Sequence, residues 1–199
     1  MLVKSLVALM LLSGSVCFAN PVDTKSPSEL AELGVHKLER LTSGANPQVE
    51  KSFQSQTTEI QVVPEGSNTK ISCLQGEAAD GSRKTATITL MNDGMIMGSA
   101  SNEASMPASP LQLPGLNAIT YLEYSLHCIQ GEDVGTSQLC ANTAALRIFA
   151  DKLTRVALTS GGDSITVEIF GVALPQKAVL TFKADGTLSD QNPIQFVNL

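Results

Sequence analysis

The sequence predicts an α+β fold in which a mostly antiparallel β-sheet of about nine or ten strands carries two helices. Three observations lead to this prediction. Apolar residues recur at helical spacing in only two segments, while apolar and polar residues alternate through most of the remaining chain. Short turns rich in Asp and Gly join the alternating segments, as in β-hairpins. Chains of consecutive hairpins form antiparallel sheets, with helices packed on one face.

The first predicted helix spans residues 26–43. Ser26 can cap it, Pro27 suits its first turn, and Glu29 stands three residues after the cap, as in a capping box. Gly44 follows as a natural stop. Four leucines fall on one face of this helix, and we expect that face to pack on the protein's own sheet rather than to dock a partner. The four are Leu30, Leu33, Leu38 and Leu41.

Two hairpins are predicted in the next part of the chain. The first joins strands at 58–63 and 69–74. The second joins strands at 84–91 and 95–100 through Asn92-Asp93-Gly94, which is the strongest hairpin signal in the sequence. Residues 101–116 show neither helical nor strand periodicity and contain three prolines, so they predict a long surface loop.

The segment 119–129 predicts a long strand, because Leu122, Leu126 and Cys128 alternate with polar residues. An acidic loop at 130–138 follows, and the apolar spacing in 139–153 predicts the second helix.

The last third of the chain reads as strands and turns. Strands are expected at 154–160, 164–172, 178–184 and 194–197, the last of them tied into the sheet. The segments 89–94 and 181–186 resemble each other. Because hairpins converge on Asp-Gly for backbone reasons, this likeness does not by itself predict an internal duplication.

The N-terminus has the three parts of a secretory signal, namely a basic start at Lys4, an apolar run and a small-residue site ending at Ala19. Residues 1–19 are therefore expected to be a cleaved signal peptide, and 20–199 a single α+β domain with the Pro-rich loop at 101–116. A membrane anchor is a weaker alternative because the apolar run is short. A lipoprotein modified at Cys17 is weaker still, since Val16 stands where a small residue is usual. The predicted location is secreted or periplasmic.

The chain is acidic, with a formal net charge of −6. This charge disfavours nucleic acid and anionic membranes as partners, because both are bound through basic surfaces. No stretch after the signal is apolar for long enough to predict a transmembrane helix. The expected partner is therefore another protein, and the sequence leaves the oligomeric state open.

The cysteines predict one disulfide. Loss of Cys17 with the signal leaves three of the four cysteines, so at most one internal bridge can form. Cys128 and Cys140 flank a short glycine-containing loop and are the favoured pair. Pairing that involves Cys73, or no bridge at all, are the alternatives.

The sequence indicates no catalytic, cofactor-binding or metal-binding residues. His36 is expected at a solvated position, and His127 should point away from its neighbour Cys128 on the predicted strand. A cysteine hydrolase would need Cys73 with His127 and either Asn142 or Asn117, although a buried role for Cys73 is favoured. Residues 185–190 form a turn rich in side-chain oxygens, from Asp185, Thr187, Ser189 and Asp190. The turn lacks the glycine and the closing glutamate of a calcium-binding helix-loop-helix, so a solvated hairpin turn is expected.

The sequence predicts export but indicates no set of catalytic residues. These two observations suggest a non-enzymatic protein that binds another macromolecule through surface loops or a sheet edge. The candidate recognition loops are the acidic loop and the Pro-rich loop. The alternatives are a small secreted hydrolase and an extracellular protease inhibitor that uses residues 107–114 as bait. The candidate recognition residues are Glu132, Asp133, Pro107, Pro110 and Pro114.

Overall fold

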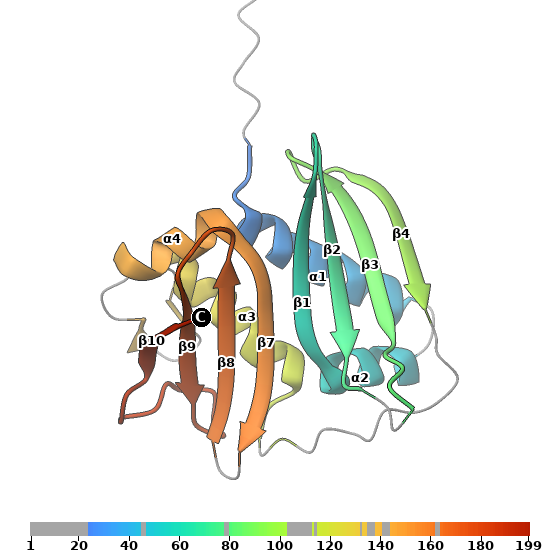
Figure 1. Ribbon diagram of the computed structural model, residues 1–199. Helices are drawn as coiled ribbons and strands as arrows, with labels where there is room; N and C mark the ends of the chain where they lie inside the picture. The colour runs from blue at the N-terminus through green and yellow to red at the C-terminus, as the bar shows by residue number, and fades with distance from the viewer. Residues whose placement is uncertain are drawn as a thin grey trace, which may run out of the picture.

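The computed structural model describes residues 24–44, 47–77, 80–102, 113, 115–131, 133–134, 138–140, 144–161 and 164–199. These residues form four helices and a single antiparallel sheet of eight strands, with a separate two-stranded ribbon. The helices lie together on one face of the sheet (Figure 1). The predicted α+β class is confirmed, but the sheet has fewer strands and its cover more helices than expected.

The first half of the chain supplies two helices and four strands. Helix α1 begins with the predicted capping box, in which Ser26 Oγ accepts from the Glu29 N–H and the Ser26 N–H donates to the Glu29 carboxylate. Helix α2 was not predicted. In order, the elements are α1 (Pro27–Ser43), α2 (Pro47–Gln56), β1 (Thr57–Glu65), β2 (Asn68–Gln75), β3 (Thr85–Met91) and β4 (Ile96–Asn102).

The second half repeats this plan with one short ribbon inserted. Its strands form three consecutive antiparallel pairs, and the C-terminal strand pairs with the strand before it, as predicted. The elements are α3 (Ala118–Gln130), β5 (Asp133–Val134), β6 (Gln138–Leu139), α4 (Ala144–Lys152), β7 (Leu153–Gly161), β8 (Ser164–Gly171), β9 (Gln176–Phe182) and β10 (Ile194–Asn198).

The predicted strand at 119–129 is wrong, because this segment is helix α3. Its buried residues come in adjacent pairs one helical turn apart, including Leu122 with Tyr121 and Leu126 with Ser125. A helix packed on a sheet and on neighbouring helices buries such a broad face, which overrides the strand propensity of its aromatic and β-branched residues. Gly131 ends the helix in the left-handed conformation, with a φ of 83°.

The second predicted helix is correct in type but too long. Helix α4 begins at Ala144, while Leu139 belongs to β6 and pairs with Asp133. At the other end Leu153 opens β7, so the helix stops one residue earlier than predicted.

The strand order is β10-β9-β8-β7-β1-β2-β3-β4, so the first strand of each half lies at the centre of the sheet. The first three pairs of equivalent strands have equal lengths, with nine residues in β1 and β7, eight in β2 and β8, and seven in β3 and β9, whereas β4 has seven residues and β10 has five. The register also shifts at equivalent places, between Thr57 and Glu59 in β1 and between Leu153 and Arg155 in β7. The two halves are therefore related by a pseudo-two-fold axis between β1 and β7.

The hydrophobic core lies between the helices and the sheet and continues through both halves. The opposite face of the sheet carries polar and charged side chains. There Arg155 stacks over the ring of Phe170 at 4.1 Å, and Arg83 binds Glu59 at 2.9 Å. Such side chains suit a face that is open to water.

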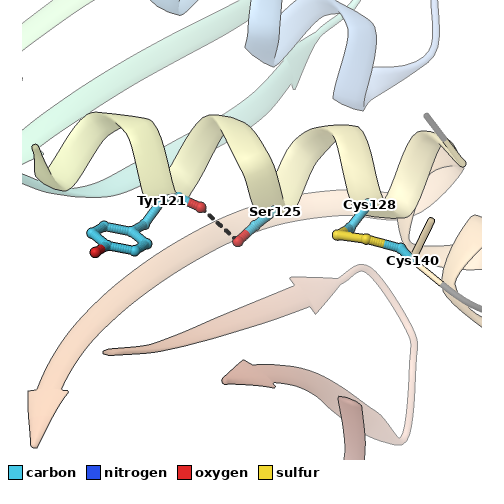
Figure 2. Close-up of a disulfide and its surroundings, with 4 residues drawn as sticks. All are labelled: Tyr121, Ser125, Cys128 and Cys140. Atoms are coloured by element: carbon cyan, nitrogen blue, oxygen red, sulfur yellow. Dashed lines mark hydrogen bonds between the residues drawn. A yellow bond between two sulfur atoms is a disulfide. The ribbon is translucent and has the colours of Figure 1, made fainter. Parts of the chain in front are cut away.

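A disulfide joins Cys128 near the end of α3 to Cys140 just before α4, with the two Cα atoms 5.3 Å apart (Figure 2). It confirms the predicted pair. On the same helix Ser125 donates a hydrogen bond to the carbonyl of Tyr121, and the Tyr121 hydroxyl donates to the carbonyl of Ala184 beyond β9. The disulfide therefore ties the end of α3 to the segment that directly follows β6.

Candidate functional site

Strand β4 ends the sheet on one side and is the most exposed strand that the structure describes. Residues 95–101 are all exposed, and Ile96 and Met97 keep 48% and 58% of their surface in contact with solvent. The strand contains no charged residue and no proline. Soluble proteins usually protect edge strands with such residues, because an unprotected edge can pair with another strand. At the opposite end β10 is likewise uncharged and exposes Phe196 and Val197.

A pocket of about 510 Å³ opens beside β4, between the sheet and the helices α1 and α2. Ser99 and Ser101 line it from β4, Leu41 and Phe53 line it from the helices, and Gln75 lies in its wall. Gln75 is only 8% exposed, and its Oε1 atom has no hydrogen-bond partner among the described residues. The predicted stripe on α1 is corrected here, because Leu41 is half-exposed at this pocket instead of lying in the core.

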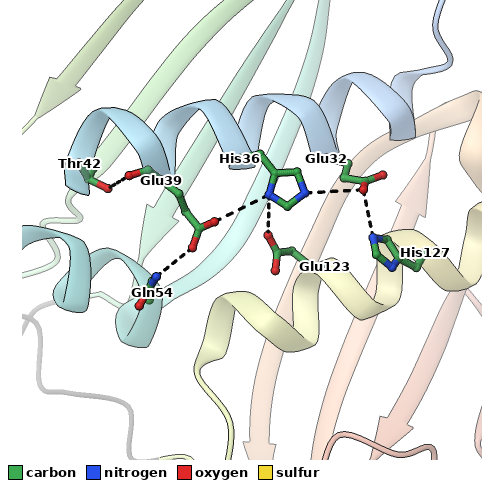
Figure 3. A network of polar contacts seen from close by, with 7 residues as sticks. All are labelled: Glu32, His36, Glu39, Thr42, Gln54, Glu123 and His127. Atoms are coloured by element: carbon green, nitrogen blue, oxygen red, sulfur yellow. Dashed lines mark hydrogen bonds and ion pairs between the residues drawn. The ribbon is translucent and has the colours of Figure 1, made fainter. Parts of the chain in front are cut away.

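A second constellation lies on the helical layer, where both histidines of the chain meet three glutamates (Figure 3). His127 Nε2 lies 3.0 Å from Glu32 Oε1. His36 Nδ1 lies 3.5 Å from Glu123 and 3.8 Å from Glu39, and its Nε2 lies 3.7 Å from Glu32. We call these five residues the Glu–His cluster.

The carboxylates of this cluster differ in their electrostatics. The hydrogen bond with His127 lowers the pKa of Glu32 below its usual value, against the opposing effect of burial. Burial raises the pKa of Glu123, and the neighbouring Glu39 carboxylate adds to the rise. The Glu123 Oε1 atom is buried and accepts no hydrogen bond from the described residues. Glu39 is held by Gln54 of α2, whose amide donates to it at 3.1 Å.

The sequence placed His127 incorrectly, because it lies on helix α3 and not on a strand. His36 lies on the predicted helix at an exposed position, as expected, but it also contacts three carboxylates. One signal for this arrangement was present. Glu and His stand four residues apart in both α1 and α3, as Glu32 with His36 and as Glu123 with His127.

Cys73 is the one free cysteine that the structure describes, and it is buried in β2. Burial raises the pKa of its thiol, and the Glu123 and Glu39 carboxylates add to this effect. The thiol is therefore protonated at neutral pH, whereas a nucleophilic cysteine acts as the thiolate.

The structure tests little of the predicted recognition loops. Glu132, Pro107, Pro110 and Pro114 lie outside the described residues, and so does Asn142. The backbone of Asp133 belongs to β5. In the oxygen-rich turn the Asp185 carboxylate accepts from the Thr187 N–H and hydroxyl, while Asp190 pairs with Lys183. These oxygens thus satisfy groups of their own loop, as in a hairpin turn.

No protein-family model matches the sequence, and no curated protein matches it significantly. Among solved structures, the chain is similar to one from Clostridium difficile 630 described as a "putative lipoprotein". The identity is 8%, the TM-score is 0.32, and the match covers 87% of this chain and 95% of the other. A likeness of this size supports no statement about function. In the described part of the chain, no helix is long and apolar enough to cross a membrane.

Proposed function

We propose that this is an exported, non-enzymatic protein that binds an extended segment of a partner protein along the edge of β4. The observation that carries the proposal is an exposed, uncharged edge strand next to a pocket. In this mode of recognition the main chain of the incoming strand pairs with the edge, and alternate side chains enter neighbouring pockets.

The geometry of β4 favours an added strand with an apolar side chain directed toward the helices. Ser99 and Ser101 lie opposite the core residue Ile88 and the partly buried Ala86 of β3, so they face the helical side. A strand added beyond β4 would direct every second side chain to the same side. The volume of the pocket is adequate for a large apolar side chain, and the Gln75 amide offers it a polar contact.

Two further observations support the non-enzymatic and exported parts of the proposal. The buried, protonated Cys73 does not supply the nucleophile that the cysteine-hydrolase alternative requires. The Cys128–Cys140 disulfide is typical of proteins that fold in an oxidising compartment. It therefore agrees with the signal predicted at residues 1–19.

The test uses a displayed library of short peptides selected on the disulfide-bonded protein. Selected peptides should slow amide hydrogen exchange in β4 when they bind, and peptides rich in charge should be absent. Ala100→Lys places a charge on the edge, and Ser52→Phe occupies the pocket from α2. We expect each variant to weaken binding at least about tenfold, because edge lysines block strand addition and the pocket gives side-chain specificity.

Thr166→Lys is the matched control, because it adds the same charge to β8, whose two edges are both paired. It should bind like the unmodified protein. Peptides that bind Ala100→Lys and Thr166→Lys equally well, or that protect amides elsewhere, would refute the proposal. So would self-association through β4, because the edge would then serve a second copy of the chain.

A further inference from the structure

We propose that His36, Glu39 and Glu123 bind a divalent transition-metal ion of the zinc class. This site lies on the helical layer and is independent of the β4 edge. Imidazole nitrogen and carboxylate oxygen are ligands that such ions accept. The three potential ligand atoms lie within 4.8 Å of one another, so a single ion can contact all of them.

The spacing of these atoms suits a metal better than hydrogen bonds. His36 Nδ1 is 3.5 Å from Glu123 Oε1 and 3.8 Å from Glu39 Oε2. Hydrogen bonds between such groups are typically about 2.7–3.2 Å long. Two ligands that each lie about 2.0–2.2 Å from a tetrahedral zinc ion are about 3.3–3.6 Å apart. The two distances from His36 are close to this spacing, and the two carboxylate oxygens lie within 4.8 Å of each other.

The pseudo-symmetry of the fold provides an internal comparison. Glu32, His36 and Glu39 of α1 have the same spacing as Glu123, His127 and Gln130 of α3. One set of equivalent contacts contains His36, Glu39 and Glu123, and the other contains His127, Gln130 and Glu32.

The two sets differ where an amide replaces a carboxylate. With Gln130 in place of Glu39, His127 closes on Glu32 at hydrogen-bond distance. With Glu39 present, the corresponding groups stay apart and the buried Glu123 Oε1 accepts no hydrogen bond from the described residues. Two carboxylates that face one imidazole leave a negative charge there, which a divalent cation offsets.

Neighbouring residues are placed to orient the ligands. Gln54 of α2 donates to the Glu39 oxygen that does not face His36. The Nε2 atom of His36 faces Glu32, so a histidine bound through Nδ1 would have a carboxylate on its other nitrogen. Because His36 is half-exposed, water can complete the coordination.

The experiment titrates zinc chloride into the untagged, disulfide-bonded protein after dialysis against a chelator, with heat as the readout. We expect one site per chain, and a weakening of at least about tenfold in His36→Gln, Glu39→Gln and Glu123→Gln. Cobalt(II) gives a second readout, since its visible absorption should appear with the unmodified protein and change in His36→Gln.

His127→Gln and Glu65→Gln are the controls. They alter the equivalent histidine and a distant exposed glutamate, and zinc affinity should stay within about threefold of the unmodified protein, because neither is a ligand. Glu123→Gln removes a buried charge, so its melting temperature in chelator should not fall, which separates lost ligation from lost folding. Equal zinc affinity in Glu39→Gln and the unmodified protein, or no zinc binding at millimolar concentration, would show that the cluster is only an ion-pair network.

Discussion

Ile60 lies directly opposite Val156 where β1 pairs with β7. Glu59 pairs with Ala157 on one side of this contact, and Gln61 pairs with Arg155 on the other. Both central residues are fully buried. The two halves of the sheet thus meet along three residue pairs, with the fourth residue of β1 opposite the fourth residue of β7 at the centre.

The first prediction concerns this contact. Ile60→Ala should lower the free energy of unfolding by about 2–5 kcal/mol, because it leaves a cavity where both halves pack. Val63→Ala on the same strand is the control. Val63 is 45% exposed, so its truncation should change the free energy by less than about 0.5 kcal/mol. Urea denaturation of the two variants measures the difference, and equal losses would mean that the contact is not central to stability.

The second prediction concerns the start of α1. Ser26→Ala removes the side chain that accepts a hydrogen bond from the Glu29 N–H. It should lower the free energy of unfolding by about 1 kcal/mol. The pKa of Glu29 is lowered mainly by its hydrogen bond with the Ser26 N–H. Its contribution to stability is therefore present above the pKa of an unfolded glutamate, about 4.3, and is lost as the pH falls through the lower folded value. Urea denaturation from pH 7 to pH 3 should show the stability gap between the unmodified protein and Glu29→Gln shrinking, and a gap that grows would contradict this assignment.

The third prediction concerns the disulfide. Replacing Cys128 and Cys140 together by alanine should destabilise the protein by about 3 kcal/mol, the loop-entropy value for a bridge of this span. Cys73→Ala changes a buried thiol without touching the bridge, so it separates cavity effects from cross-link effects. In the folded protein Cys73 should resist alkylation until denaturant is added. A Cys73 that is alkylated rapidly under native conditions would contradict its buried, protonated state.

The fourth prediction compares two glycines. A Cβ atom at Gly34 would lie 2.9 Å from the side chain of Ile71, which is fully buried in β2. Gly34→Ala should therefore destabilise the protein by about 1–3 kcal/mol despite the better helix propensity of alanine. A Cβ atom at Gly98 on β4 meets no atom within 4 Å, so Gly98→Ala should be neutral or slightly stabilising. Thermal unfolding of both variants tests the difference in sign.

Local signals in the sequence predicted the local features correctly. Ser26 with Glu29 predicted the start of α1, Asn92-Asp93-Gly94 predicted the β3–β4 turn, and the short spacing of Cys128 and Cys140 predicted their bridge. Each of these depends on residues that are close in the chain. Geometry of this kind is largely independent of the rest of the fold.

Features that depend on tertiary packing were missed. The alternation in 119–129 predicts a strand, although Thr120, Glu123, His127 and Gln130 recur at helical spacing along the less buried side of α3. Placing this segment on a strand separates His127 from α1, so the strand prediction does not bring the Glu–His cluster together despite the repeated Glu–His spacing. The pocket beside β4 depends on how far the helical layer covers the sheet, which no local pattern encodes.

The two ends of the sheet have a consequence for the behaviour of the protein in concentrated solution. Both β4 and β10 are uncharged, and they lie at opposite ends of the sheet. An object with two open ends that cannot close on itself grows as a linear polymer, one copy added to the next. A partner strand bound along β4 would therefore also cap this end of the sheet against the addition of a second copy, and a lysine on either edge strand would have the same effect.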